Sequence, residues 1–197
     1  MDNKNLFAIG GIIIGVLFGI IFAGAVFPEI RSGNIGMMDT IDRHFIEQMI
    51  PHHDGAIAMA TVALKKATRP EIKTLAAAIV KDQNNEIGDM RNWYQDWFQT
   101  AVPKGDLSPM GGGMMSGSGM HMGGQEDMQA LGNANDFDKA FIEAMIPHHQ
   151  LAVMMAQMLR SGTNRPEMLS LANNIIESQS KEIREMQSWY ESWYNQI

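Results

Sequence analysis

Apolar residues recur at steps of three and four along two stretches of the chain, which is the spacing of one helix face. The first stripe predicts a helix over about residues 40–66 with Asp39 as its N-cap; its members are Phe45, Met49, His52, Ala56, Met59 and Ala63. The second predicts a helix from Pro70 to about residue 100, with Thr68 and Glu71 at capping-box spacing; its members are Leu75, Ile79, Gln83, Glu86, Met90, Trp93 and Trp97.

Both stripes occur a second time. Residues 42–98 align without a gap on residues 138–194, and 25 of these 57 positions are identical. Each copy therefore predicts one helical hairpin, over residues 39–101 and 135–197. Two antiparallel hairpins bury their stripes most economically against each other. The sequence thus predicts an all-α fold in which duplicated antiparallel helical hairpins form a four-helix bundle.

The N-terminal region has a different character. Leu6–Phe27 carries no charge, follows Lys4 and ends near a small-x-small pattern at Ala23-Gly24-Ala25. Such a segment acts as a transmembrane anchor or as a signal peptide that is cleaved. We therefore expect residues 1–30 to form an apolar helix that exports the rest of the chain to the periplasm or the cell exterior, with possible membrane attachment.

Composition adds an anomaly, because the chain has 18 Met and no Cys. Residues 102–134 are rich in glycine, which predicts a flexible loop. A loop has no core to fill, so core packing does not explain its thioethers. They belong to Met110, Met114, Met115, Met120, Met122 and Met128, with His121 among them.

Charge and residue types exclude several functions. The net charge of −7 gives no electrostatic footprint for nucleic acid. The absence of Cys excludes thiolate catalysis and Cys-ligated zinc or iron–sulfur centres. No nucleophile, base and orienting acid occur at motif spacing, so we expect no enzymatic activity.

Paired histidines suggest a metal. His52-His53 recurs as His148-His149, and thioethers accompany both pairs at helical spacing; these are Met49, Met59, Met145, Met154, Met155 and Met158. Thioethers select monovalent copper, imidazole accepts either oxidation state, and calcium or magnesium would require oxygen donors. The sequence predicts monovalent and divalent copper, with silver as a surrogate, bound by these residues and by Met110, Met114, Met115, Met120, His121 and Met122. Glu47 and Glu143 are expected to orient the imidazoles.

The motif Phe-Ile-Glu-x-Met-Ile-Pro-His-His, at residues 45–53 and 141–149, resembles a ferritin-like helical family catalogued as a domain of unknown function. With its apolar N-terminal segment and Met-rich loop, the chain is similar to a periplasmic copper-binding protein implicated in copper resistance. The resemblance covers residues 39–197 and implies copper binding through Met49, His52, His53 and their counterparts. The copies differ at His44/Ala140, Asp54/Gln150 and Ala58/Met154, so the two sites need not be equivalent.

The interpretation is an exported copper binder that sequesters, buffers or hands over copper, with copper-exporting or copper-accepting proteins as partners. A di-iron carboxylate protein is one alternative, but it needs Glu-x-x-His pairs, whereas Glu47 precedes His52 by five residues. A metal-free interaction scaffold, using the tryptophans near the helix ends, is another. Since imidazole has an unperturbed pKa of about 6.5, acidification to about pH 5 is expected to strip divalent copper before monovalent copper.

Overall fold

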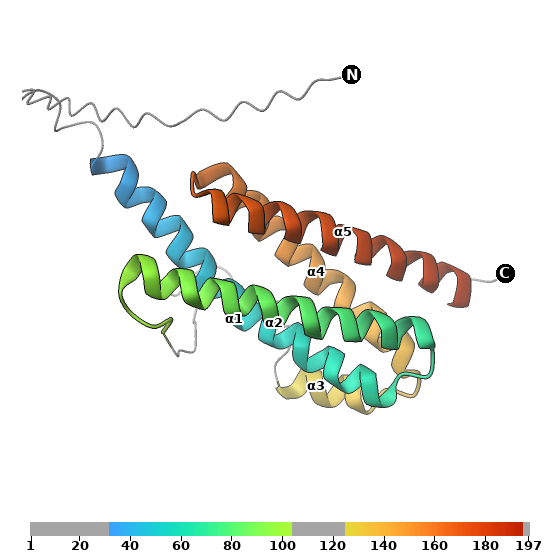
Figure 1. Ribbon diagram of the computed structural model, residues 1–197. Coiled ribbons are helices and arrows are strands. Elements are labelled where there is room, and N and C mark those ends of the chain that lie inside the picture. Colours follow the sequence, from blue (N-terminus) through green and yellow to red (C-terminus); the bar gives the residue numbers. More distant parts are fainter. Residues whose placement is uncertain (1–31, 104–124, 195–197) are drawn as a thin grey trace, which may run out of the picture.

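Two helical hairpins make up most of the described chain. The computed structural model describes residues 32–103 and 125–194, with α1 (Ser32–Lys66), α2 (Pro70–Phe98), α3 (Gln125–Gly132), α4 (Phe137–Gly162) and α5 (Pro166–Tyr194). Figure 1 shows α1 with α2 and α4 with α5 as the hairpins. These ranges contain no strand, so the predicted all-α fold is confirmed. The expected N-terminal helix lies outside them, and no described helix is long and apolar enough to span a membrane.

The first helix starts earlier than its stripe predicts. Because α1 begins at Ser32, Asp39 lies inside it, and the prediction that Asp39 is an N-cap is wrong. The Asp39 carboxylate instead accepts a hydrogen bond from Arg165 Nη2 at 2.5 Å. Arg165 precedes α5, so this carboxylate connects the two hairpins instead of capping its own helix.

A residue of the other hairpin also stabilises the start of α2. Pro70 opens α2 as predicted, but its N-cap is Arg69, which makes no side-chain cap bond, so the Thr68–Glu71 capping box is wrong. Asp138 of α4 replaces it. Its carboxylate accepts from the backbone N–H of Thr68 at 3.1 Å and of Arg69 at 3.0 Å, and also from the Thr68 hydroxyl.

The region between the hairpins is not all loop. Within residues 102–134, predicted as a flexible loop, the structure contains α3, which packs beside α1 and α4. The N-cap of α4 is Asp136, which accepts from the backbone N–H of Lys139 at 3.0 Å. Residues 104–124 lie outside the described ranges, so the expected ligands Met110–Met122 and His121 are not placed.

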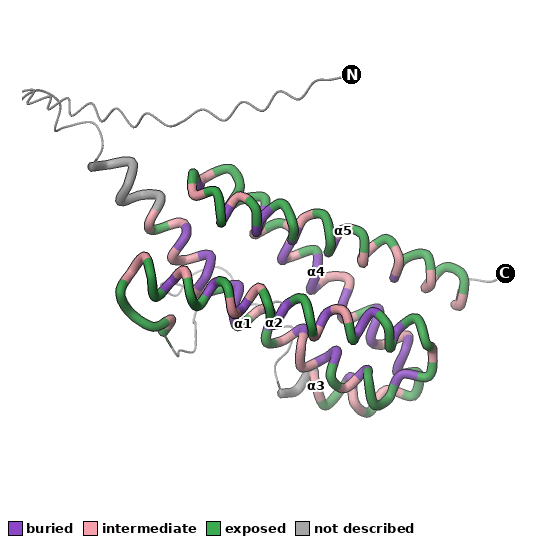
Figure 2. The backbone as a smooth tube through the Cα atoms, viewed as in Figure 1, coloured by how far each residue is buried: buried purple, intermediate pink, exposed green. Residues whose placement is uncertain are grey.

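Two apolar clusters fill the bundle, one toward each end. Figure 2 shows buried residues along each of the four long helices. Cluster A joins the buried residues of Ala56–Ala67, Ile72–Ile79 and Phe137–Met145 with Leu131 and Met186. Cluster B joins those of Phe45–Ile50, Ile87–Tyr94, Ala152–Leu159 and Met168–Ile175. In both clusters α1 meets α4 in antiparallel register. The boundary between them falls at residues 51–55 of α1 and 146–151 of α4, where both histidine pairs lie.

Candidate metal centre

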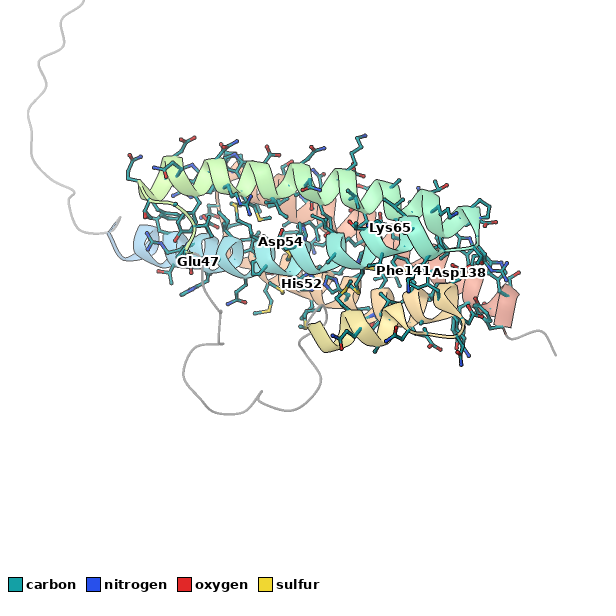
Figure 3. The ribbon with its side chains drawn as sticks, turned by 90° about the horizontal axis from the view of Figure 1, so that it is seen from below. Glu47, His52, Asp54, Lys65, Asp138 and Phe141 are labelled. Atoms are coloured by element: carbon teal, nitrogen blue, oxygen red, sulfur yellow. The ribbon has the colours of Figure 1, made fainter. Side chains whose placement is uncertain are left out.

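Both predicted histidine pairs meet in one buried layer between the two apolar clusters. His53, His148 and His149 are fully buried, and the two ring nitrogens of His52 are buried as well. The rings of His52 and His148 are in contact, with centroids 3.8 Å apart. Figure 3 shows His52 near the middle of α1. The structure thus brings together residues that are 96 positions apart in the sequence.

In each pair, one imidazole is hydrogen-bonded to a carboxylate on the other helix of the same hairpin. Glu86 Oε2 of α2 lies 2.6 Å from His53 Nε2, and Glu182 Oε2 of α5 lies 2.6 Å from His149 Nε2. An ionised carboxylate only accepts hydrogen bonds, so Nε2 carries the proton in both rings. The remaining nitrogen, Nδ1, is buried and has no hydrogen-bond partner among the described residues, so it is the ring atom available to a metal ion.

Glu47 and Glu143 do not take the role that the sequence suggested. Glu47 accepts a hydrogen bond from Tyr94 Oη at 2.5 Å, and Glu143 accepts one from Tyr190 Oη at 2.7 Å. Glu47 also lies 3.6 Å from the exposed imidazole of His44. The expectation that they orient the paired histidines is therefore wrong. Sequence proximity suggested them, whereas the real partners lie 33 residues away on the opposite helix of each hairpin.

Six ring nitrogens in this layer have no hydrogen-bond partner within the described residues. They are Nδ1 and Nε2 of His52 and of His148, and Nδ1 of His53 and of His149. Buried polar atoms are normally satisfied, because each unmet hydrogen bond costs about 1–3 kcal/mol. The buried Oε1 atoms of Gln83 and Gln179 also have no hydrogen-bond partner among the described residues. Such a set of free donor atoms is unfavourable for packing and suitable for holding a ligand.

The rings of His52 and His148 are neutral at neutral pH. Burial lowers the pKa of His52 to about 3, and the neighbouring histidines lower it further in the same direction. Burial likewise lowers the pKa of His148 to about 2, again with help from the other histidines. Neutral imidazole is the form that binds metal, so these rings need not lose a proton at neutral pH.

The spacing within each pair suits one ion. The ring centroids are 6.4 Å apart in His52-His53 and 6.3 Å apart in His148-His149. An imidazole nitrogen lies about 1 Å from its ring centre and binds metal at about 2 Å, so two rings on opposite sides of one ion have centroids about 6 Å apart. No described group of three or more histidines and carboxylates is placed to hold a metal. Each pair provides two imidazoles, fewer than the three or four protein ligands of zinc sites.

The predicted methionine ligands that the structure describes differ in position and burial. Met49 and Met59 are both buried, but Met49 lies in cluster B and Met59 in cluster A. Ten helical residues separate them, about 15 Å along the axis, so they do not share one ion. In the second copy Met145 is fully buried and Met155 is half-buried. Met154 and Met158 are exposed on α4, by 47% and 69%, and their sulfurs fill no core.

Removing the carboxylate charge beside His53 and His149 is expected to weaken metal binding. Replacing Glu86 and Glu182 by Gln keeps an acceptor for Nε2 but removes the carboxylate that makes the ring more basic. We expect an affinity for monovalent copper that is lower by about 10- to 100-fold, as for other outer partners of metal-bound histidines. Competition titration measures this, and Glu47→Gln is the matched control, since Glu47 contacts neither pair. An equal loss in the control would contradict the assignment.

A family comparison gives the histidine layer its context. The model of a family described as "Domain of unknown function (DUF305)" matches residues 42–190, which include both hairpins and all four paired histidines. The chain belongs to this family. The resemblance read from the Pro-His-His motif is thereby confirmed, and the two histidine pairs lie at equivalent places in two copies of a DUF305 hairpin.

Several DUF305-like structures are similar to this chain. CopM in the Cu(II)-bound form is 49% identical, with a TM-score of 0.67, over 78% of this chain and 97% of CopM. CopM in the Cu(I)-bound form is 47% identical over the same shares, with a TM-score of 0.65. A DUF305 protein from Streptomyces coelicolor, described as a candidate secreted protein, is 26% identical over 77% of this chain and 93% of that one, with a TM-score of 0.65.

One curated relative matches this chain over a much shorter segment. An uncharacterized protein of Acanthamoeba polyphaga mimivirus is 43% identical over 51 residues, which are 26% of this chain and 34% of that protein. The match thus spans about a third of the length of this relative. The similarity to the solved DUF305 structures, which extends over nearly their whole length, carries more weight for the fold.

Proposed function

We propose that this protein binds copper outside the cytoplasm and sequesters, buffers or hands over the metal in copper homeostasis and resistance. The observation that carries the proposal is the pair of buried imidazoles in each hairpin, with unpartnered Nδ1 atoms and a carboxylate hydrogen-bonded to one ring. His52 and His53 form one site, and His148 and His149 form the other. The role is binding and transfer, without catalysis.

The donor set favours monovalent copper in this layer. Two imidazoles at the spacing of a shared ion suit a metal that accepts few, soft ligands. Solved structures of CopM, which is 47–49% identical to this chain in these states, contain Cu(I), Ag or Cu(II). Divalent copper also binds imidazole and is a second cargo.

The alternatives receive less support. A di-iron carboxylate protein needs several carboxylates and histidines around two ions, and the described residues contain no such group of three or more. A metal-free scaffold would gain stability if the unpartnered imidazoles were replaced by apolar residues. Export agrees with the apolar segment Leu6–Phe27 and with the absence of Cys, which avoids unwanted disulfides in an oxidising compartment. Membrane attachment through this segment and transfer to copper-exporting or copper-accepting proteins belong to the same proposal.

The thioethers of the predicted loop at residues 102–134, called the linker below, are expected to contribute separately to copper binding. Replacing Met110, Met114, Met115, Met120 and Met122 by Leu retains apolar volume and removes five soft donors. We expect fewer weakly bound copper ions, an unchanged melting temperature and unchanged tight binding at the histidines. Metal analysis and calorimetry on the same samples measure both quantities. A lower melting temperature with full copper content would show that the linker has a structural role instead.

Anaerobic loading of the full-length chain tests the proposed function. Monovalent copper is added at less than one equivalent and the sample is examined by X-ray absorption. Filling of the histidine layer first predicts nitrogen neighbours at about 2 Å. A spectrum without the outer-shell scattering of imidazole rings, or no retained copper after gel filtration, would contradict the proposal.

A further inference from the structure

Residues 42–98 of the first copy contain three methionines, and all three are also methionines in the second copy. Met49, Met59 and Met90 correspond to Met145, Met155 and Met186. Most other buried apolar positions are identical in the two copies as well, although Ile72 corresponds to Met168 and Ala63 to Leu159. Thioether sulfur therefore occurs at these three positions in both halves of the chain.

Two of the three methionines face each other in each hairpin. Met49 lies on α1 between Glu47 and His53, and Met90 lies on α2 between Glu86 and Tyr94. The bonds Glu47–Tyr94 and His53–Glu86 fix the register of the two helices on both sides of this pair. Met49 and Met90 are fully buried and both belong to cluster B, and this register places them at the same level of the bundle.

The second hairpin repeats this arrangement. The bonds Glu143–Tyr190 and His149–Glu182 bracket Met145 on α4 and Met186 on α5. Both methionines are fully buried in cluster A. The two facing methionine pairs thus lie on opposite sides of the histidine layer.

The third methionine comes from the other hairpin. Met155 of α4 packs against cluster B, and Met59 of α1 belongs to cluster A. The His52–His148 contact sets the level of α1 against α4, which places Met155 about 6 Å farther from the histidine layer than Met49. Long side chains in a helix lean toward its N-terminus. Met155 therefore leans back toward the layer and Met49 leans away from it, which brings the two sulfurs toward one level.

We infer that each group of three methionines forms a thioether site for a monovalent soft cation, copper or silver, beside the histidine layer. One site consists of Met49, Met90 and Met155, and the other of Met145, Met186 and Met59. Three neutral thioethers select such ions over divalent ones. Glu86 and Glu182, one helical turn from Met90 and Met186, supply nearby negative charge that offsets the cost of a buried cation. This inference goes beyond the proposed function, which rests on the histidines.

Silver ion is the probe, and the full-length chain with isotope-labelled methionine methyl groups is the sample. We expect the methyl NMR signals of Met90 and Met186 to shift on silver addition. The matched control is Met168, a fully buried methionine of cluster B whose counterpart is Ile72. Its signal should stay in place. Equal responses of Met90, Met186 and Met168 would overturn the inference.

Ion counting by native mass spectrometry gives an independent measurement. The variant M49L/M90L/M155L, in which sulfur is lost but volume is kept, is expected to bind one silver ion fewer than the parent chain, and M168L the same number as the parent. An unchanged count in the triple variant would overturn the inference. The imidazole NMR signals report on the proposed function separately: if they do not respond to silver while the methionine signals do, the histidine sites are wrong and the thioether sites remain.

Discussion

Replacing His52, His53, His148 and His149 together by Ala is expected to remove the tightest binding of monovalent copper. All four imidazoles lie in the same buried layer, and six of their ring nitrogens have no partner among the described residues. Loss of an outer partner alone lowers metal affinity by about 10- to 100-fold, so loss of the ligands themselves is expected to exceed 100-fold. A competition titration with a chelator of known affinity measures the change.

The helices should survive this substitution, because clusters A and B lie on either side of the layer and contain no histidine. Circular dichroism checks this point. His44→Ala is the control, since His44 is exposed on α1 and contacts Glu47 instead of the paired histidines. Tight binding that persists in a helical quadruple variant would place the main copper site elsewhere.

Acid is expected to destabilise the metal-free protein well above the pH at which its carboxylates titrate. In the unfolded chain a histidine has a pKa of about 6.5. In the fold, burial lowers the pKa of His52 to about 3 and that of His148 to about 2. The unfolded state therefore binds protons first as the pH falls. The stabilising contribution is complete above about pH 6.5 and is lost progressively toward pH 3.

The size of this effect is large. Below pH 6.5 the contribution of each histidine rises toward about 1.4 kcal/mol per pH unit, so the two together remove roughly 3 kcal/mol of unfolding free energy between about pH 6.5 and pH 5. Domains have about 5–15 kcal/mol in total, so the melting temperature should fall by roughly 10 °C. Calorimetry across this range measures the change, and the variant H52Q/H148Q should show a flatter profile. A melting temperature of the parent chain that is constant down to pH 5 would refute the prediction.

The same shifts change the expectation for acid release of copper. From an unperturbed pKa, loss of divalent copper is expected near pH 5. With His52 and His148 neutral to far lower pH, protons compete with metal at these rings only when the fold itself is failing. Selective release from the folded protein by mild acid is therefore not expected at these two ligands.

The sequence was sufficient for features that depend on local spacing. The stripes through Phe45 and Leu75 predicted the hairpins, and the internal repeat predicted one histidine pair in each hairpin. Both hairpins are present, and the structure adds that the two pairs, His52-His53 and His148-His149, meet in one layer. Helix-face periodicity identifies inward positions well because it arises from the helix itself.

The predictions that failed depended on partners from elsewhere in the chain. Asp138 caps α2 from the other hairpin, and Arg165 engages Asp39 from the start of α5, so no local capping pattern reveals either contact. Glu86 was recognised as a residue of the inward stripe, but its pairing with His53 depends on the register of α1 against α2. The signal for this pairing in the sequence was that both inward stripes contain a polar residue, His in one and Glu in the other.

The His52–His148 contact also describes how the two halves are related. Residue 148 is the counterpart of residue 52, so this contact joins a position to its own equivalent, as happens at the axis of a symmetric homodimer. A chain with only one hairpin would have to associate with a second copy to build the layer, and dilution would take it apart. Here both halves are joined in one polypeptide, so the layer forms within a single molecule. Its capacity for metal therefore does not depend on protein concentration.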